Sequence, residues 1–361
     1  MRIALLAHTN APWTPHYARH FQSAGHEVRV FSFSPDPLDG VEVMYLKTAV
    51  LPGPLNPLGF ALSLPRVRRL INLFHPDVVL ATYMSSNGMT AALCWSGPLV
   101  VSARGGDVLR QAGHLPGGWF HAPMMRFVCS RARTVHAVSE EIVEALVGCG
   151  VPAGKIVGFP MGVDIDSFTP GSAARRQDAP LHILCTRKQE TVYRNDTLVE
   201  ALHRLRQTGR EFRCTIAGGG PLLQERLAQV RRLDLSDVVT CTGHVSHETI
   251  RSLLATADVY VSASSSDGTS SSLLEAMACG LFPVISRIRA NLPWVRDGET
   301  GLFFQVGEAA DLSRALARAL DDPALRERAS TANRTLVERE ANQKTNLDRM
   351  LGLLRAAAGT T

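Results

Sequence analysis

Residues 259–280 read Val-Tyr-Val-Ser-Ala-Ser-Ser-Ser-Asp-Gly-Thr-Ser-Ser-Ser-Leu-Leu-Glu-Ala-Met-Ala-Cys-Gly. The apolar run Val259–Ser262 is typical of a short buried strand. A polar stretch with one glycine follows it, and Ser271–Ala278 then has the residue pattern of a helix. A strand, a polar loop and a helix in this order form the repeating unit of folds in which helices cover a parallel sheet. The stretch therefore predicts an α/β fold with a polar loop at the carboxyl end of a strand.

The same alternation continues on both sides of this stretch. In the first half we expect strands at 3–7, 27–32, 78–81, 99–102 and 134–137, and helices at 15–24, 64–73, 89–94 and 140–147. In the second half we expect strands at 182–185, 213–217, 238–242, 259–262 and 282–286, and helices at 198–207, 222–232, 247–256, 271–278 and 310–320. The run 325–358 is mostly helical in pattern. These elements predict two doubly wound domains.

A segment rich in proline, glycine and charge, with little apolar periodicity, separates the two halves. We expect an N-terminal Rossmann-like domain at 1–161, a linker at 162–180 and a C-terminal Rossmann-like domain at 181–335. A final helix at 336–361 is expected to return to the N-terminal domain. Parallel sheets bind ligands at the carboxyl ends of their strands, so we expect the two domains to face each other across a binding cleft.

Composition excludes several classes of protein. The 361 residues are 45% hydrophobic and 20% charged, which is typical of a globular protein, and no apolar run is long enough to span a membrane. The seven cysteines are scattered without a Cys-x-x-Cys pair, so neither a disulfide framework nor a zinc site is indicated. The net charge of +5 is modest and forms no basic stripe, so no nucleic-acid partner is expected. The N-terminus lacks the pattern of a signal peptide, and we expect a cytoplasmic protein.

The loop after Val259–Ser262 has the chemistry of a phosphate and sugar site. Ser270, Ser271 and Ser272 would supply free backbone N–H groups at a helix N-terminus, where phosphate is favoured. Asp267 and Glu275 lie eight positions apart, so that the first is in the loop and the second about one turn into the helix. A carboxylate accepts two hydrogen bonds from a vicinal diol, which suits sugar and ribose hydroxyls. The alternative is that Asp267 only caps the helix and Glu275 is a solvated helical residue.

The same stretch resembles the GT-B glycosyltransferases, specifically retaining family 4, whose signature is Glu-x7-Glu followed by Ala-Met-Ala-x-Gly-x-Pro-Val-Ile. The chain has Asp267-x7-Glu275 and then Ala-Met-Ala-Cys-Gly-Leu-Phe-Pro-Val-Ile, with one extra residue before Pro283. Further similar motifs lie at 162–168, 218–221, 243–245 and 297–302, and looser ones at 25–28 and 105–107. The resemblance implies a GT-B fold and a transferase that uses a nucleotide sugar.

The resemblance also implies roles for individual residues. Arg187 and Arg194 would bind the donor diphosphate, Glu275 the ribose, the Val245 backbone the base, and Asp267 the donor sugar. The remaining donor-binding residues would be Gly218, Gly219, Gly268, Thr269, Ser270 and Ser271. The alternative for the two arginines is a surface position, since 34 of the 38 basic residues are arginine.

The first domain departs from the family pattern. Many relatives have a histidine where this chain has Arg104, so no general base can be assigned there. Together with Asp267, Arg104 and Asp107 are the candidate catalytic residues. Arg104 would bind the diphosphate or an anionic acceptor near the reacting centre, and Asp107 an acceptor hydroxyl; alternatively these two residues form an ion pair. His16 follows the first strand and is a candidate acceptor contact, or a helix-start histidine without such a role.

Two further patterns are weighed against the resemblance. Asp164-Ile165-Asp166 has the spacing of a metal-binding Asp-x-Asp motif, but it lies within the linker signature, so no metal or other cofactor is expected. The apolar, proline-rich residues 51–64 are expected to form a long loop, packed on its own domain or, with nearby arginines, in peripheral contact with the inner face of the plasma membrane.

The sequence therefore predicts a metal-independent retaining glycosyltransferase for polysaccharide, lipopolysaccharide or glycolipid assembly. Its donor is expected to be a UDP-sugar, with a GDP-sugar as second choice, and its acceptor a sugar, glycolipid or other hydroxyl compound. The alternatives are a GT-B sugar-nucleotide epimerase and a nucleotide-sugar-binding assembly subunit whose catalysis has decayed. A pyridoxal-dependent phosphorylase is disfavoured because only Lys188 of the four lysines lies near the predicted site.

Overall fold

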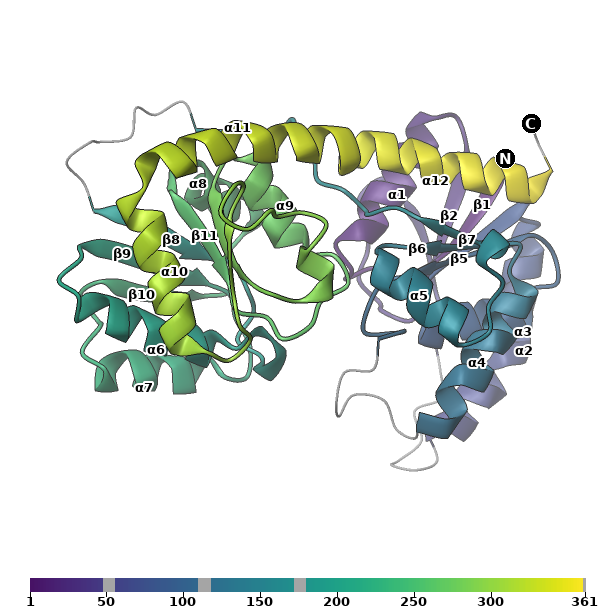
Figure 1. Cartoon of the computed structure of the whole chain (residues 1–361). Coiled ribbons are helices and arrows are strands. Elements are labelled where there is room, and N and C mark those ends of the chain that lie inside the picture. Colours follow the sequence, from purple (N-terminus) through teal and green to yellow (C-terminus); the bar gives the residue numbers. More distant parts are fainter. Residues whose placement is uncertain (48–55, 110–117, 172–179, 360–361) are drawn as a thin grey trace. The chain divides into compact units, whose positions relative to one another are not determined.

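A computed structural model describes residues 1–47, 56–109, 118–171 and 180–359 (Figure 1). The chain divides into two compact units. Unit 1 comprises Met1–Pro160 and Thr345–Thr361, and unit 2 comprises Met161–Lys344. Residues 345–361 therefore cluster with the first unit, and residues 162–171 of the expected linker cluster with the second.

Within its described residues, unit 1 has a seven-stranded parallel sheet in the order β3-β2-β1-β4-β5-β6-β7. Its strands are β1 (Arg2–Leu6), β2 (Glu27–Ser32), β3 (Glu42–Tyr45), β4 (Val78–Thr82), β5 (Leu99–Ala103), β6 (Thr134–Ala137) and β7 (Ile156–Gly158). Every residue of β4 and β5 is buried. Central strands of a parallel sheet are covered on both faces, which explains their continuous apolar sequences.

The helices of unit 1 are α1 (Trp13–Ser23), α2 (Asn56–Phe74), α3 (Met89–Cys94), α4 (Gly118–Arg131), α5 (Glu140–Gly148) and α12 (Gln343–Ala358). A π-helical turn, Tyr83–Gly88, follows β4 directly. Ser139 caps α5 by accepting a hydrogen bond from the backbone N–H of Ile142, as its position before two glutamates predicts.

Within its described residues, unit 2 has a six-stranded parallel sheet in the order β10-β9-β8-β11-β12-β13. Its strands are β8 (Leu181–Cys185), β9 (Phe212–Ala217), β10 (Val239–Gly243), β11 (Val259–Ser262), β12 (Phe282–Ser286) and β13 (Leu302–Phe304). Its helices are α6 (Asn195–Arg206), α7 (Leu223–Arg232), α8 (His247–Thr256), α9 (Ser271–Ala278), α10 (Ala309–Asp321) and α11 (Pro323–Glu340).

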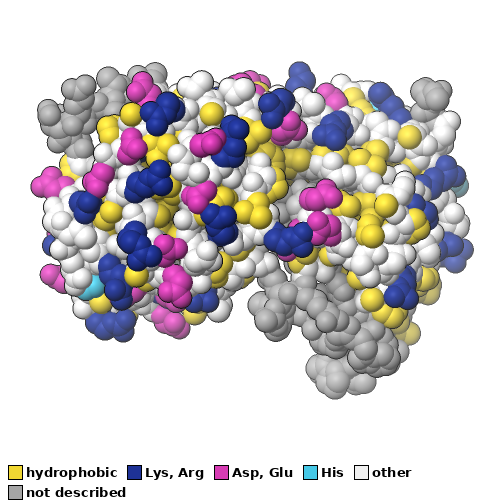
Figure 2. All heavy atoms as spheres, in the orientation of Figure 1, with side chains coloured by type: hydrophobic (Ala, Val, Ile, Leu, Met, Phe, Trp, Pro, Cys, Tyr) yellow, Lys and Arg dark blue, Asp and Glu magenta, His cyan; other side chains and the backbone are white. Residues whose placement is uncertain are grey.

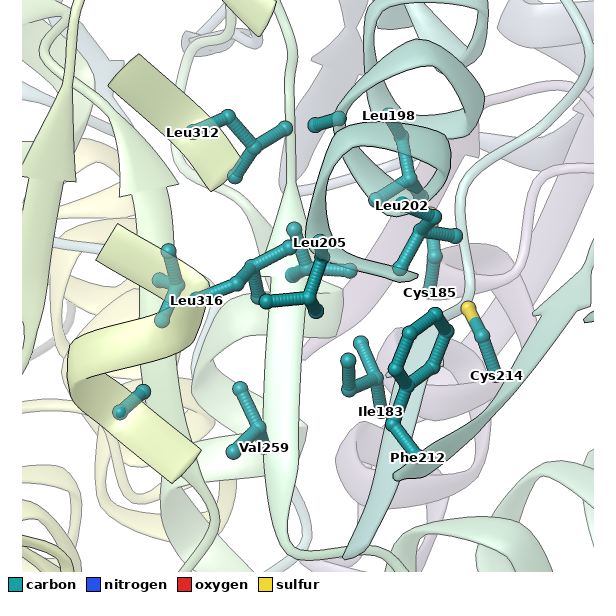
Figure 3. Close-up of a cluster of buried hydrophobic side chains, with 14 of the residues drawn as sticks. Ile183, Cys185, Leu198, Leu202, Leu205, Phe212, Cys214, Val259, Leu312 and Leu316 are labelled. Carbon is teal, nitrogen blue, oxygen red and sulfur yellow. The ribbon is translucent and has the colours of Figure 1, made fainter. Parts of the chain in front are cut away.

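The core of unit 2 forms where α6 and α10 cover one face of this sheet. Figure 3 shows leucines of the two helices, including Leu202 and Leu316, directed at strand residues such as Ile183 and Phe212. All four of these side chains are buried. Full burial of one such side chain contributes about 1.5–3 kcal/mol. The opposite face packs against α9 and α11 through a second apolar cluster.

Arg334 of α11 binds the start of the linker, residues 165–168, to the rest of unit 2. Its guanidinium donates hydrogen bonds to the carbonyl oxygens of Ile165 at 3.0 Å, Phe168 at 2.5 Å and Ala278 at 3.0 Å. Because Ala278 ends α9, the same arginine also satisfies a carbonyl group at the C-terminus of that helix. Residues 163–168 therefore belong to the packed structure of unit 2.

Several expectations about the elements need correction. Residues 56–64 are not part of a loop, because they form the first turns of α2, which contains Pro65; residues 51–55 lie outside the described residues. Because proline is tolerated in the first turns of a helix, a proline-rich start is a poor signal for a loop. The helical run 325–358 is two helices that separate near Ala341. The short strands β3, β7 and β13 were not predicted, because three or four residues carry too little periodicity.

On the face shown in Figure 2, basic and acidic side chains are interspersed and do not gather into a single stripe. None of the helices among the described residues is long and apolar enough to cross a membrane.

Gly162 provides a test of the packing between the linker start and the end of α11. It has φ +84°, and a Cβ there would lie 2.5 Å from the carbonyl oxygen of Ala341 and 2.8 Å from the backbone nitrogen of Gln343. Gly209 has a similar φ of +77°, but nothing lies within 4 Å of its Cβ position. We expect Gly209→Ala to lower the free energy of unfolding by about 1 kcal/mol, the cost of the left-handed backbone alone. Gly162→Ala should lower it by at least about 2 kcal/mol, as measured by urea denaturation, and equal effects would contradict this packing argument.

Candidate functional site

The candidate site of unit 2 lies where the strand order of its sheet reverses. From β8 the chain proceeds outward to β9 and β10, and it then returns to the other side of β8 with β11. The loops that follow β8 and β11 must therefore diverge above neighbouring strands, which creates the crevice where open parallel sheets bind ligands. The backbone N–H of Ser265 in the second loop donates to the carbonyl of Val192 in the first, at 2.8 Å. The topology thus brings residues 186–194 and 263–270 together.

Arg187 is the central charged group of this crevice. Its guanidinium donates to a carboxylate oxygen of Asp267 at 2.6 Å, and to the hydroxyls of Ser270 at 2.9 Å and Ser272 at 2.8 Å. Arg187 is only 8% exposed, and its guanidinium lies 4.3 Å from the centre of the Tyr193 ring. Burial is the largest single effect and disfavours its charge, but the Asp267 carboxylate, together with Tyr260, Tyr193 and Cys185, outweighs burial, so the pKa of Arg187 is raised. The guanidinium is therefore a permanent cation whose hydrogen bonds join the two loops.

The N-terminus of α9 lies beside this ion pair. Ser270 is its N-cap residue, and its side chain accepts a hydrogen bond from the backbone N–H of Leu273. The Ser272 hydroxyl also accepts a hydrogen bond from the hydroxyl of Tyr260 on β11, at 3.0 Å. The N-terminus of an eight-residue helix and a buried arginine thus provide positive potential at one place, which is suited to phosphate.

Next to these groups is a pocket of about 530 Å³. This volume lies within the usual range for small-molecule sites. Its lining residues are Thr186, Lys188, Glu190, Ala217, Gly218, Gly219, Gly220, His244, Val245, His247, Ile250, Ser272 and Glu275. Gly218 is required here because a Cβ would lie 2.3 Å from the carbonyl oxygen of Arg187. The glycine turn after β9 therefore packs directly against the loop after β8 and forms a wall of the pocket.

Glu275 is a partly buried acid in the wall of the pocket. Burial raises its pKa to about 7, although the nearby charge of Arg187 opposes the shift. No residue in the described part of the chain donates a hydrogen bond to its carboxylate. The site therefore keeps an acceptor group desolvated and unpaired, an arrangement that costs free energy unless a ligand supplies donors.

The structure brings together most of the donor-site residues that the sequence predicts. Gly218, Gly219, Val245 and Glu275 line the pocket, and Asp267 and Ser270 contact Arg187 beside it. Gly268, Thr269 and Ser271 lie in the same loop and at the first position of α9. The backbone N–H of Gly268 donates to the Asp267 carboxylate at 3.0 Å.

Arg194 is not among the residues that line the pocket. It has φ +47° at the start of α6, its closest acidic partner is Asp196 at 4.0 Å, and its guanidinium approaches Gly307. Lys188 lines the pocket instead. Sequence reasoning placed Lys188 near the site but assigned it no role in donor binding. The sequence signal that could have identified Lys188 as a candidate donor-binding residue was its position directly after Arg187, in the loop that follows β8.

In unit 1, Arg104 and Asp107 form a tight loop after β5. The Asp107 carboxylate accepts hydrogen bonds from the backbone N–H groups of Arg104 at 3.0 Å, Gly105 at 2.8 Å and Met84 at 2.7 Å. The Arg104 guanidinium donates to the hydroxyl of Tyr17 at 3.3 Å, and these two described residues, Arg104 and Asp107, do not form an ion pair. Asp107 therefore positions this loop against the turn that follows β4.

His16 lies on α1, three residues after Trp13, and is exposed. Its ring centre is 6.4 Å from that of Trp13. This places it near the carboxyl end of β1 in unit 1.

The Asp-x-Asp pattern at 164–166 is part of a local turn. Asp164 accepts hydrogen bonds from the backbone N–H of Asp166 at 3.1 Å and from the hydroxyl of Ser167 at 2.6 Å. Among the described residues, no group of three or more metal-binding side chains is present.

Comparison with protein families identifies two matches that together cover most of the chain. Residues 174–336 match the family described as glycosyl transferases group 1, and residues 15–167 match glycosyltransferase family 4. The boundary between the two matches falls in the same region as the boundary between unit 1 and unit 2.

Curated relatives are similar over part of their length. A D-inositol 3-phosphate glycosyltransferase of Pseudarthrobacter chlorophenolicus is 28% identical, over 69% of this chain and 64% of the relative. A GDP-mannose-dependent phosphatidylinositol monomannoside mannosyltransferase of Mycolicibacterium smegmatis is 26% identical, over 65% and 66%. The colanic acid biosynthesis protein WcaL of Escherichia coli is 29% identical, over 57% and 52%. The chain thus spans between half and two thirds of the length of these relatives.

Solved structures match the whole chain. A glycosyltransferase of Rickettsia africae has a TM-score of 0.82 at 16% identity, and covers 100% of this chain and 99% of its own. Anabaena HepE in complex with UDP and glucose has a TM-score of 0.79 at 17% identity, with 99% and 100% coverage. These similarities show the GT-B fold, as the sequence predicts.

The raised pKa of Glu275 leads to a prediction about stability. An acid whose pKa is higher in the folded state destabilises the fold as pH rises from its unfolded pKa, about 4.5, to its folded pKa, about 7. Glu275→Gln removes this penalty. We expect the variant to unfold at the same temperature as the wild type near pH 4 and to be more stable by about 1–3 kcal/mol at pH 8.

The measurement is thermal unfolding of both proteins between pH 4 and 8. Glu299→Gln, at a side chain that is 68% exposed, is the matched control, and its difference from the wild type should not vary in this way. A difference for Glu275→Gln that stays constant between pH 4 and 8 would contradict the burial of its charge.

Proposed function

Since the chain belongs to the group 1 glycosyltransferases of the GT-B fold, we propose that it transfers a sugar from a nucleoside diphosphate sugar to an acceptor hydroxyl. The observation that carries this proposal is the combination, at one topological switch point, of the buried Arg187, the N-terminus of α9 and the unpaired Glu275 carboxylate. Arg187 and the N-terminus of α9 suit the diphosphate of such a donor, and the Glu275 carboxylate suits its ribose. The pocket of about 530 Å³, which Ser272 and Glu275 line, has room for a nucleoside.

In the proposed donor complex, Glu275 accepts hydrogen bonds from the two ribose hydroxyls. Ribose binding would supply the donors that this carboxylate lacks among the described residues, so the cost of its burial is recovered on binding. The base would lie against Val245 and His244, which follow β10 on the pocket wall. The glycine turn at 218–220 leaves the backbone close enough to contact the ligand directly.

Arg187 and the N–H groups at the start of α9 would hold the diphosphate. Breaking the bond between the sugar and the phosphate leaves negative charge on the diphosphate, and a fixed cation with a helix N-terminus stabilises that charge as it develops. Asp267 would contact the donor sugar while it holds Arg187 in place. Retention of the anomeric configuration and binding without a metal are part of the proposal through the family resemblance.

The donor base is proposed as uridine, with guanosine as the second choice. Anabaena HepE was solved with UDP and with UDP-glucose, whereas the mycobacterial relatives are named as GDP-mannose-dependent. The relatives' names also refer to colanic acid biosynthesis, D-inositol 3-phosphate and phosphatidylinositol monomannoside. We therefore propose a role in polysaccharide or glycolipid assembly on the cytoplasmic side, with an acceptor that is a sugar or a glycolipid.

The proposed donor site predicts which nucleotides stabilise the protein. We expect UDP, or in its place GDP, to raise the melting temperature in the presence of EDTA, because a ligand of the folded state alone shifts unfolding. Arg187→Gln should reduce the affinity for that nucleotide at least 10-fold, since a charge-assisted contact with phosphate is lost. The control is Arg314→Gln, at a side chain that is 72% exposed, which should leave the shift unchanged. No shift with UDP, GDP, ADP or dTDP would overturn the donor site.

A second prediction compares the contributions of Lys188 and Arg194 to binding of the nucleoside diphosphate. Lys188 lines the pocket and Arg194 does not, so we expect Lys188→Met to weaken binding of the nucleoside diphosphate more than Arg194→Met does. Isothermal titration calorimetry at low salt measures both affinities. The opposite order would restore the assignment that the family resemblance gives to Arg194. A product assay with the wild type separates a transferase from a decayed binding subunit, which would bind the donor without turnover.

A further inference from the structure

We propose that Arg104 is the centre of an oxyanion site in unit 1, and that it takes a phosphate group carried by the acceptor. This inference rests on the proposed transferase function, because it names the chemical class of the second substrate. It is carried by the position of Arg104 in the fold, by the environment of its guanidinium and by the way its loop is held.

The side chain of Arg104 extends toward the topological switch point of the sheet of unit 1, which lies between β1 and β4. From β1 the chain proceeds outward to β2 and β3, and it then returns to the other side of β1 with β4 and β5. Arg104 directly follows β5, and its guanidinium contacts Tyr17 and Trp13 of α1, which follows β1. The side chain thus reaches from the end of β5 to the helix that begins after β1, above the crevice where such a sheet binds ligands.

The guanidinium is a cation surrounded by neutral groups. Its central carbon lies 5.5 Å from the centre of the Tyr17 ring and 5.9 Å from that of Trp13. Its only recorded side-chain hydrogen bond within the described residues is the 3.3 Å contact with the Tyr17 hydroxyl, and its Nε and Nη1 atoms are buried without a partner. A partly buried arginine with two unpaired nitrogen atoms carries a desolvation cost that an oxyanion can offset with two parallel hydrogen bonds.

The acidic residue nearest in sequence does not neutralise this cation. Both oxygens of Asp107 accept hydrogen bonds from backbone N–H groups, among them those of Arg104 itself and of Met84 after β4. No ion pair of Arg104 is recorded within the described residues, and residues 110–117, which follow this loop in sequence, contain no aspartate or glutamate. The carboxylate therefore fixes the loop, while the positive charge stays available to a ligand.

Trp13 provides a fluorescence signal for binding at Arg104. Trp13 is at the first position of α1 and is partly exposed, whereas Tyr17 is fully buried. The Trp13 ring centre lies 5.9 Å from the guanidinium carbon, so an oxyanion bound to Arg104 changes the electrostatic environment of that ring and should change the fluorescence of Trp13.

The site also differs in kind from the donor site in unit 2. There, Arg187 is already paired with Asp267, and an anion has to compete with a carboxylate. Arg104 has no such competitor among the described residues, so it can bind a single phosphate without first losing an ion pair. A phosphate on the acceptor and the diphosphate of the donor can therefore be distinguished by which arginine each requires.

The test is a tryptophan fluorescence titration of the full chain with inorganic phosphate, at constant ionic strength set with sodium chloride. We expect a saturable change in the wild type that persists in Arg187→Gln and is lost in Arg104→Gln. Trp13→Phe should remove the signal while calorimetry still detects phosphate binding. Arg104→Lys keeps the charge but loses the planar fork, and should weaken binding about 3- to 10-fold.

Each other result has a definite meaning. A change that survives in Arg104→Gln, or the absence of any saturable change in the wild type, overturns the proposal. Loss of the change in Arg187→Gln with no effect of Arg104→Gln places the phosphate in the donor site and also overturns it. If Arg104→Gln does not fold, as judged by circular dichroism, the Arg104→Lys titration decides, and unchanged affinity in that variant counts against the site. UDP binding, measured separately by thermal shift, reports on the proposed donor site, so the two hypotheses can fail independently.

Discussion

The reversal of strand order in a parallel sheet is the constraint on which both candidate sites depend. In each unit the chain leaves a central strand in one direction and returns on its other side, at β1 and β4 in unit 1 and at β8 and β11 in unit 2. Loops at such a point diverge, and the strand ends expose polar groups that the sheet does not pair. In unit 2, Arg187 follows β8, one of the two switch strands. In unit 1, Arg104 follows β5, the strand beside β4, and its side chain reaches α1, which follows β1.

The two arginines are held in different ways, and the difference decides their chemistry. Arg187 makes hydrogen bonds with a carboxylate and two serine hydroxyls from the loop after β11, so it joins the walls of the donor site before any ligand arrives. Arg104 contacts aromatic rings, and its neighbouring acid is used to fix the backbone. A paired cation is suited to a ligand that brings several negative charges, whereas an unpaired cation is suited to a single oxyanion.

Glu275 is a proposed binding residue that lowers the stability of the folded protein when no ligand is bound. Burial raises its pKa to about 7, so near neutral pH the empty site holds a carboxylate in an unfavourable environment. The same desolvation makes the group a strong acceptor once ribose hydroxyls replace water. Stability and donor affinity are therefore expected to change in opposite directions when this charge is removed.

The sequence by itself determined the α/β class, the order of most of the longer strands and helices, and the loop at 263–270, because these depend on local periodicity and on a motif of adjacent residues. The helix α4 was not predicted. The sequence also predicted that Asp267 and Glu275 can reach one ligand, since a loop followed by one helical turn fixes their spacing. Only the tertiary structure decided that Arg187 pairs with Asp267, that Lys188 and not Arg194 lines the pocket, and that Asp107 binds backbone N–H groups. These contacts join loops that follow different strands, and the packing of the whole sheet, not local sequence, sets the distances between them.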